Sequence, residues 1–249
     1  MNNIFTIAAH ELRRLFKSPL AWIILGVVEF LLAVFFFLLL NQFLNPAPWY
    51  AGRGVTEIVV AGVFQVSGII ILLIAPLVTM RIFSEERRTG TINLLLSSPV
   101  SLTELVLGKY LGLLAFFVIM LALITLMPLS LLLGTPIDLL QTASGLLGLF
   151  LLTASFAAIG VFVSTLSAQP AAAAIMTFGI LFMLWIINMA ANTGNETTRL
   201  VFEYLSLLNH YNNLIVGVFN SADVFYYLIV CLTFIGLSIW RLDMDRLPA

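Results

Sequence analysis

The sequence predicts an all-α integral membrane protein with six membrane-spanning helices, an amphipathic N-terminal helix in the membrane interface and two re-entrant helices at the outer face. Three observations lead to this fold class. Of the 249 residues, 61% are hydrophobic and only 9% are charged, whereas about 25% of the residues of a soluble domain are charged. The apolar residues form long runs separated by short polar segments. The basic residues gather in alternate segments, as in proteins that cross a membrane several times.

The apolar runs define six spans within a single transmembrane domain over residues 1–249. A helix needs about 20 apolar residues to cross a hydrocarbon core about 30 Å thick. The runs that reach this length lie at about 19–43, 58–80, 102–133, 142–166, 170–190 and 222–240. A capping box, Ser101-Leu-Thr-Glu104, opens the third span, and Pro170 takes the first helical position of the fifth.

Residues 2–17 form an amphipathic pattern that is too short and too charged to span. The apolar residues share one helical face: Ile4, Phe5, Ala8, Leu12, Leu15 and Phe16. The ionisable residues lie largely off this face: His10, Arg13, Arg14 and Lys17. This pattern predicts a helix in the headgroup plane, with its cations near anionic lipid. It serves either as a plain anchor or as an elbow that also touches a cytoplasmic partner.

The segment between the last two spans is too apolar for an ordinary loop. Two groups repeat at helical spacing: Leu200, Tyr204, Leu207 and Leu208, and then Leu214, Val218 and Phe219. Because Asn209 to Asn213 interrupts the pattern, we predict two re-entrant helices over about 199–219. A soluble cap is the alternative, which the apolar character disfavours. His210 is expected at the surface or the interface.

The distribution of basic residues predicts the orientation in the membrane. Six spans place both termini on one side, together with nine basic residues: Arg13, Arg14, Lys17, Arg81, Arg87, Arg88, Lys109, Arg241 and Arg246. The other side has only Arg53 and Arg199. Since basic loops stay in the cytoplasm, both termini are predicted to be cytoplasmic. The net charge of −1 indicates no nucleic-acid partner.

No pattern of a catalytic or metal site occurs in the sequence. There are two histidines, His10 and His210, and one cysteine, Cys231, which is expected to be a small apolar side chain. Gly108-Lys109-Tyr110 lacks the hydroxyl residue and the earlier glycine of a phosphate-binding loop. The chain is therefore predicted to hold neither metal nor ATP, and energy for any work must come from elsewhere.

Glu29 is the ionisable residue that lies deepest in a predicted span, roughly 14 Å from its start at 1.5 Å per residue. Because a charge is costly there, we expect Glu29 to face the bundle interior, a water-filled path or a partner subunit. The alternative is a protonated glutamate that is hydrogen-bonded to a neighbouring helix. Gln65, Ser67 and Asn188 are polar residues in other spans that could join it in a translocation path or dimer interface.

The loop over about 83–98 combines a charged half with an apolar half. Ser84 is expected to cap a short helix whose first turn holds Glu85 and Glu86. Gly90 breaks this helix, and a second turn carries the apolar residues Leu94 to Leu96. We expect a helix parallel to the membrane, charged towards the cytoplasm and apolar towards the bilayer, rather than an ordinary connector.

The stretch Phe83–Ser101 and the following Gly108-Lys109-Tyr110 resemble the cytoplasmic loop of ABC-2-type exporter permeases. The closest similarity is to the gliding-motility-associated and copper-maturation permeases. The resemblance covers the whole chain and implies a six-helix, type V exporter-like bundle in the bacterial inner membrane. In that family the loop is a coupling helix that docks in a separate ATPase subunit. The matching docking positions here are Glu85, Glu86, Arg87, Gly90 and Thr91.

The resemblance also implies the partners and the activity. Two permeases form a homodimer with two ATPase subunits, which bind ATP and Mg²⁺, and the pathway lies between the permeases near spans one, two and five. The chain is then the permease subunit that couples ATP hydrolysis to export or to force on a periplasmic accessory subunit. A lipidic or amphipathic substrate is favoured, because the predicted helices leave little internal polar lining. An ATP-independent channel or assembly factor is the alternative function.

Overall fold

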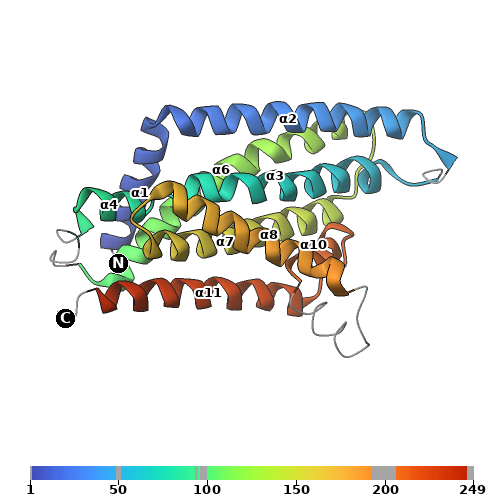
Figure 1. Ribbon diagram of the computed structural model, residues 1–249. Coiled ribbons are helices and arrows are strands. Elements are labelled where there is room, and N and C mark those ends of the chain that lie inside the picture. Colours follow the sequence, from blue (N-terminus) through green and yellow to red (C-terminus); the bar gives the residue numbers. More distant parts are fainter. Residues whose placement is uncertain (1, 49–51, 93–94, 96–99, 192–205, 246–249) are drawn as a thin grey trace.

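The computed structural model describes residues 2–48, 52–92, 95, 100–191 and 206–245 of the chain, and in these residues it is built from helices (Figure 1). The helices are α1 (Asn2–Lys17), α2 (Pro19–Leu44), α3 (Ala61–Thr79), α4 (Ser84–Thr89), α6 (Leu102–Ser130), α7 (Leu139–Leu166), α8 (Pro170–Ala191), α10 (Leu207–Ile215) and α11 (Ser221–Met244). A π-helical turn, Thr56–Val60, leads into α3, and a 3₁₀ turn, Leu131–Leu133, follows α6.

Five of the described helical stretches are long and apolar enough to cross a membrane: Pro19–Leu44, Thr56–Thr89, Leu102–Leu133, Leu139–Leu166 and Ser221–Met244. They cover five of the six predicted spans. The fifth predicted span coincides with α8, whose described side chains form a shorter apolar stretch, Pro170–Ile186. These long apolar helices confirm the prediction of an all-helical membrane protein.

Local signals place the helix ends. Ser101 and Glu104 form the predicted capping box at the start of α6, and Pro170 begins α8 as expected. Asp138 starts α7 a few residues earlier than predicted, because its carboxylate accepts hydrogen bonds from the N–H groups of Leu140 and Gln141.

α7 is the central helix and contacts α3, α6, α8, α10 and α11. Its small residues let neighbouring helices approach closely, as is usual between helices in membranes. A Cβ atom on Gly160 would lie 2.2 Å from Thr79 Oγ1 of α3, and one on Gly148 would lie 2.8 Å from Leu214 Cβ of α10. Helix α2 is peripheral by contrast and exposes large apolar side chains, among them Trp22, Val27, Phe30 and Phe37.

α1 runs across one end of the bundle and packs against α6 (Figure 1). Two glycines on one face of α6 make this contact, since a Cβ atom on Gly108 would lie 2.7 Å from Ile7 Cβ and one on Gly112 would lie 2.7 Å from the Ala8 carbonyl oxygen. The amphipathic helix therefore uses its apolar side to cover α6.

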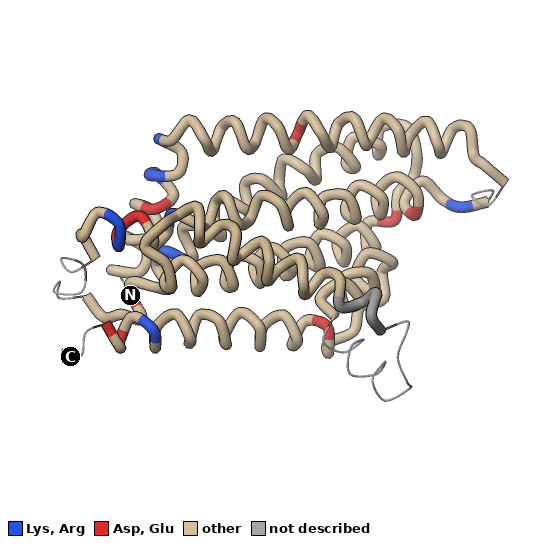
Figure 2. The backbone as a smooth tube through the Cα atoms, in the orientation of Figure 1, with Lys and Arg blue, Asp and Glu red and all other residues tan. Residues whose placement is uncertain are grey.

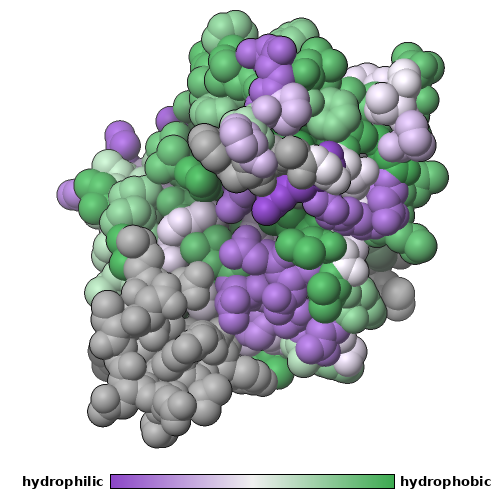
Figure 3. Space-filling view, turned by 90° about the vertical axis from the view of Figure 1, so that its right-hand side faces the viewer, coloured by the Kyte–Doolittle hydropathy of each residue, from purple (hydrophilic) through white to green (hydrophobic). Residues whose placement is uncertain are grey.

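The end of the bundle that holds α1, α4 and the last turn of α11, here called the basic end, carries both ends of the chain and most of its Lys and Arg residues (Figure 2). The segment between α2 and the π-helical turn, which includes Arg53, lies at the opposite end (Figure 1). Figure 3 shows this end face on, with hydrophilic residues near its centre and apolar residues beside them.

Candidate functional site

The charged loop forms α4 at the basic end, directly after α3. Ile82 and Phe83 are buried and hold the connecting turn against the bundle. The prediction that Ser84 caps α4 is wrong: Ser84 Oγ donates to the Met80 carbonyl, because the turn continues the helical path from α3 and presents that carbonyl to the hydroxyl. Gly90 ends α4 with φ +74°, a left-handed conformation that favours glycine.

Lys109 of α6 joins α4 to the bundle. Its Nζ atom donates to the Ile82 carbonyl oxygen at 3.0 Å and lies 2.5 Å from Glu86 Oε1 and 3.6 Å from Glu11 Oε2. The ammonium also lies 5.1 Å from the centre of the Phe83 ring. One buried cation therefore contacts α1, the turn after α3, and α4.

The two carboxylates around Lys109 are shielded from water. Glu11 is 2% exposed, and its Oε1 atom lies 2.6 Å from Arg14 Nη2. The side chain of Glu86 is 14% exposed, and its carboxylate pairs with the Lys109 ammonium. Charges in such a setting depend on their partners, because an unpaired buried charge is strongly unfavourable.

A second ion pair joins α4 to the end of the chain. Arg87 binds Asp245, and Arg241 Nη1 also binds Asp245 at 2.8 Å. Asp245 directly follows α11, and Arg241 lies in the last turn of that helix. The pair between Arg87 and Asp245 therefore connects α4 to the end of α11. Together with Lys109, this pair gives α4 contacts to α1, α6 and α11.

The positions predicted to dock a partner divide into two groups. Three of them are exposed: Glu85, Gly90 and Thr91. Glu86 and Arg87 are half-buried and take part in the ion pairs with the bundle. Arg88 and Thr89 are exposed as well. We call Glu85, Arg88, Thr89, Gly90 and Thr91 the outer face of α4. Predicted Leu94 and Leu96 lie outside the described residues.

Of the polar residues predicted for a path or dimer interface, the three with described side chains, Glu29, Gln65 and Ser67, share no hydrogen bond with one another. Glu29 is half-buried in α2, and its Oε1 atom is buried without a hydrogen-bond partner. Gln65 is exposed on α3, whereas Ser67 is buried and donates to the Val63 carbonyl of its own helix at 2.7 Å. The side chain of Asn188 lies outside the described residues.

His210 is buried, which corrects the expectation of a surface position. Its Nδ1 atom lies 2.6 Å from Asp223 Oδ1, and its ring stacks on Tyr226 at 4.2 Å. Asn213 Nδ2 reaches the other carboxylate oxygen at 3.4 Å. These contacts join α10 to the start of α11.

The Asn209–Asn213 stretch continues α10, although it was predicted to separate two short helices. Ser206 caps the helix by accepting from the Asn209 N–H, and Asp223 accepts from Asn213, so the polar run has partners within the fold. The first of the two predicted re-entrant helices falls largely within residues 192–205, outside the described part of the chain.

A family model described as ABC-2 family transporter protein matches residues 5–247, nearly the whole chain. The chain belongs to the ABC-2 transporter family. A search among curated proteins finds no match. The family membership confirms the resemblance inferred from the loop and makes the chain a membrane component of an ABC transporter.

Sequence reasoning found α4 but missed three residues that hold it in place: Glu11, Lys109 and Asp245. A signal was present for Lys109, because a lysine within an apolar helical run requires a counter-charge.

Proposed function

We propose that this chain is the permease subunit of an ATP-driven exporter, with six spans that include α8, and that it works as a homodimer with two cytoplasmic ATPase subunits. The ATPases bind ATP and Mg²⁺, and the permease has no catalytic role. Its basic end faces the cytoplasm of the bacterial inner membrane. The excess of basic residues at that end and the family membership support this arrangement.

The observation that carries the proposal is the set of ion pairs that joins α4 to the bundle, with a buried lysine, Lys109, at its centre. Lys109 and Asp245 connect α4 to α1, α6 and α11, so a displacement of α4 acts on three helices at once. The outer face of α4 remains exposed for a partner. ATP-driven closure of the ATPases would push α4, and the helices would change access to a path between the two permeases. A lipidic substrate is favoured; force on a periplasmic subunit is the related alternative.

Co-purification with the ATPase subunit tests the proposal. We expect Glu85→Lys to abolish the association, because it reverses a charge on the outer face of α4. Glu57→Lys is the matched control, since Glu57 is an exposed glutamate just before α3 at the opposite end of the bundle. Full association of the Glu85→Lys and Gly90→Pro variants would show that α4 is not the docking element. If the wild-type chain binds no ATPase, the ATP-independent channel or assembly factor becomes the better description.

A further inference from the structure

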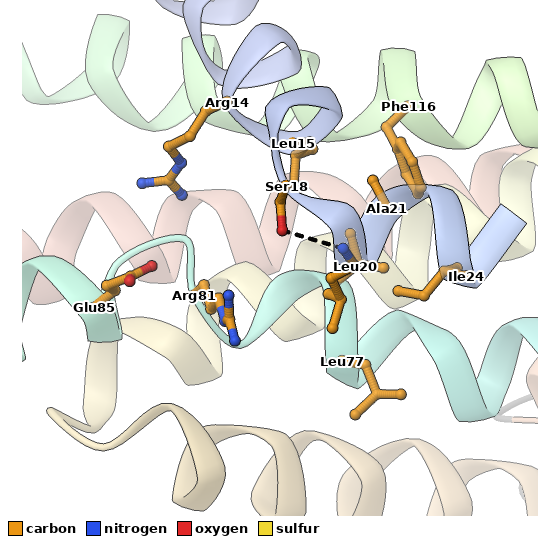
Figure 4. Close-up of a pocket in the computed structure, with 11 residues that line it drawn as sticks. Arg14, Leu15, Ser18, Leu20, Ala21, Ile24, Leu77, Arg81, Glu85 and Phe116 are labelled. Atoms are coloured by element: carbon orange, nitrogen blue, oxygen red, sulfur yellow. Dashed lines mark hydrogen bonds between the residues drawn. The ribbon is translucent and has the colours of Figure 1, made fainter.

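A pocket of about 370 Å³ opens at the basic end between the start of α2 and the end of α3, with α1 and α6 behind it (Figure 4). Its walls include Arg14, Ser18, Ile24, Leu77, Arg81 and Glu85. The volume lies in the range of small-molecule sites, about 300–1,000 Å³. We call it the interfacial pocket.

The interfacial pocket has a polar half and an apolar half. Figure 4 shows Arg14, Arg81 and Glu85 on one side, and the hydrocarbon side chains of Ile24 and Phe116 on the other. A purely polar ligand would leave the apolar wall in water, and a purely apolar one would desolvate the arginines. The lining therefore matches an amphipathic ligand.

The charge of the polar half favours an anion. Arg81 has no ion-pair partner among the described residues, and its side chain is exposed to the pocket. Arg14 binds Glu11 through Nη2 and is 34% exposed, so other N–H groups of its guanidinium can still donate. The charged residues of the lining are thus two arginines and one carboxylate, Glu85, while Glu11, the partner of Arg14, does not line the pocket. Guanidinium groups match phosphate oxygens in geometry and charge.

The position of the pocket indicates where the ligand comes from. Trp22 is 61% exposed at the start of α2, and its Nε1 donates to the Phe16 carbonyl at 3.0 Å. Tryptophan side chains gather at the level of the lipid headgroups. Arg13 and Lys17 are further exposed cations on α1, the helix that supplies Arg14 to the pocket. The pocket therefore lies where headgroups meet acyl chains, on the side proposed to be cytoplasmic.

We infer that the interfacial pocket binds an anionic phospholipid of the cytoplasmic leaflet, with its phosphate between Arg81 and Arg14 and the upper part of one acyl chain along Ile24 and Leu77. The bound lipid contacts α1, α2 and the end of α3, which supply the lining residues named above. Glu85 lies on α4, so the headgroup also lies next to the outer face of α4. The inference does not depend on ATP coupling.

Native mass spectrometry of the purified full-length chain with phosphatidylglycerol or phosphatidylcholine tests this site. We expect selective retention of phosphatidylglycerol by the wild-type chain. Arg81→Gln should weaken that retention about tenfold, in line with the loss of one charge-assisted contact. Leu77→Trp should also weaken it, because the indole fills the apolar half without changing the charge. Thermal unfolding in lipid-free detergent would verify that both variants fold.

Arg13→Gln is the control, since Arg13 is an exposed cation on α1 that does not line this pocket. It should retain phosphatidylglycerol like the wild type. An equal loss for Arg13→Gln and Arg81→Gln would mean that the lipid follows the general surface charge, which would overturn the site. Equal retention of phosphatidylcholine would overturn the selectivity for anionic lipid. Displacement of the lipid by millimolar inorganic phosphate alone would show a phosphate site rather than a lipid site.

Discussion

Lys109 Nζ lies 2.5 Å from Glu86 Oε1, so a lysine within the apolar helix α6 holds a glutamate of the loop helix α4. Glu11 of α1 supplies the second carboxylate at 3.6 Å. One ammonium thus compensates two buried carboxylates from different elements. Removing it takes the ion-pair partner from Glu86 and leaves Glu11 with Arg14 alone.

We expect Lys109→Met to destabilise the protein by about 3 kcal/mol or more, the usual cost of breaking a buried ion pair from one side. The measurement is chemical or thermal unfolding in detergent. Lys17→Met is the control, because Lys17 is exposed on α1, and a surface change of this kind stays within about 0.5 kcal/mol. Restoring the balance with Glu86→Gln should recover part of the loss. Equal stability of the two lysine variants would mean that the Lys109 pairs contribute nothing.

The close contact between α1 and α6 gives a second prediction. Gly112→Ala should destabilise the protein by about 1–3 kcal/mol, because the new methyl group would meet the backbone of α1 at Ala8. Gly26→Ala is the matched substitution, since no atom lies within 4 Å of a Cβ there. It should be neutral or stabilise α2 by up to about 1 kcal/mol through helix propensity. The measurement is thermal unfolding of both variants in the same detergent. Equal stability of Gly112→Ala and Gly26→Ala would contradict the close contact between α6 and α1 at Gly112.

The sequence was sufficient for the elements whose signals are local. The apolar runs placed the long helices, Ser101 and Glu104 gave the start of α6, and Pro170 gave the start of α8. These features depend on residues a few positions apart, so pattern and capping chemistry predict them. The close contact at Gly108 and Gly112 was not predicted, because only the structure shows that α1 packs on these two glycines.

The partners of the charged residues could not be predicted from the sequence, for a physical reason. Glu11 and Lys109 are 98 positions apart in the sequence, and only the path of α1 across α6 brings them together. The same holds for Arg87 and Asp245. His210 was expected at the surface, because the sequence does not show that the Asp223 carboxylate is its hydrogen-bond partner inside the fold. Burial of a polar group follows from the availability of a partner, which is a tertiary property.

The His210–Asp223 pair leads to a third prediction, on the attachment of α10 to α11. A double-mutant cycle with His210→Ala and Asp223→Ala should give a coupling of about 1–3 kcal/mol, as for residues in direct buried contact. Asn213→Ala should cost less, because its 3.4 Å contact with the same carboxylate is long. Hydrogen exchange of the α10 amides is the second readout and should accelerate in both single variants of the pair. Additive effects with unchanged exchange would argue against the pair as the attachment.

Glu29 gives the last prediction, which concerns the proposed homodimer. Its Oε1 atom is buried without a hydrogen-bond partner in the described part of one chain, and the neighbouring surface of α2 is apolar and exposed at Val27 and Phe30. A polar atom in this state is costly unless a group from outside the chain satisfies it. We therefore expect Glu29→Leu to lower the association constant of the dimer about tenfold. Analytical ultracentrifugation in detergent measures this constant. Glu29→Gln, which can still hydrogen-bond, should remain close to the wild type, and Val27→Leu controls for the size of the side chain. The prediction is wrong if Glu29→Leu dimerises as well as Glu29→Gln while its monomer becomes more stable. In that case the Glu29 carboxyl destabilises the single chain and does not contribute to the dimer.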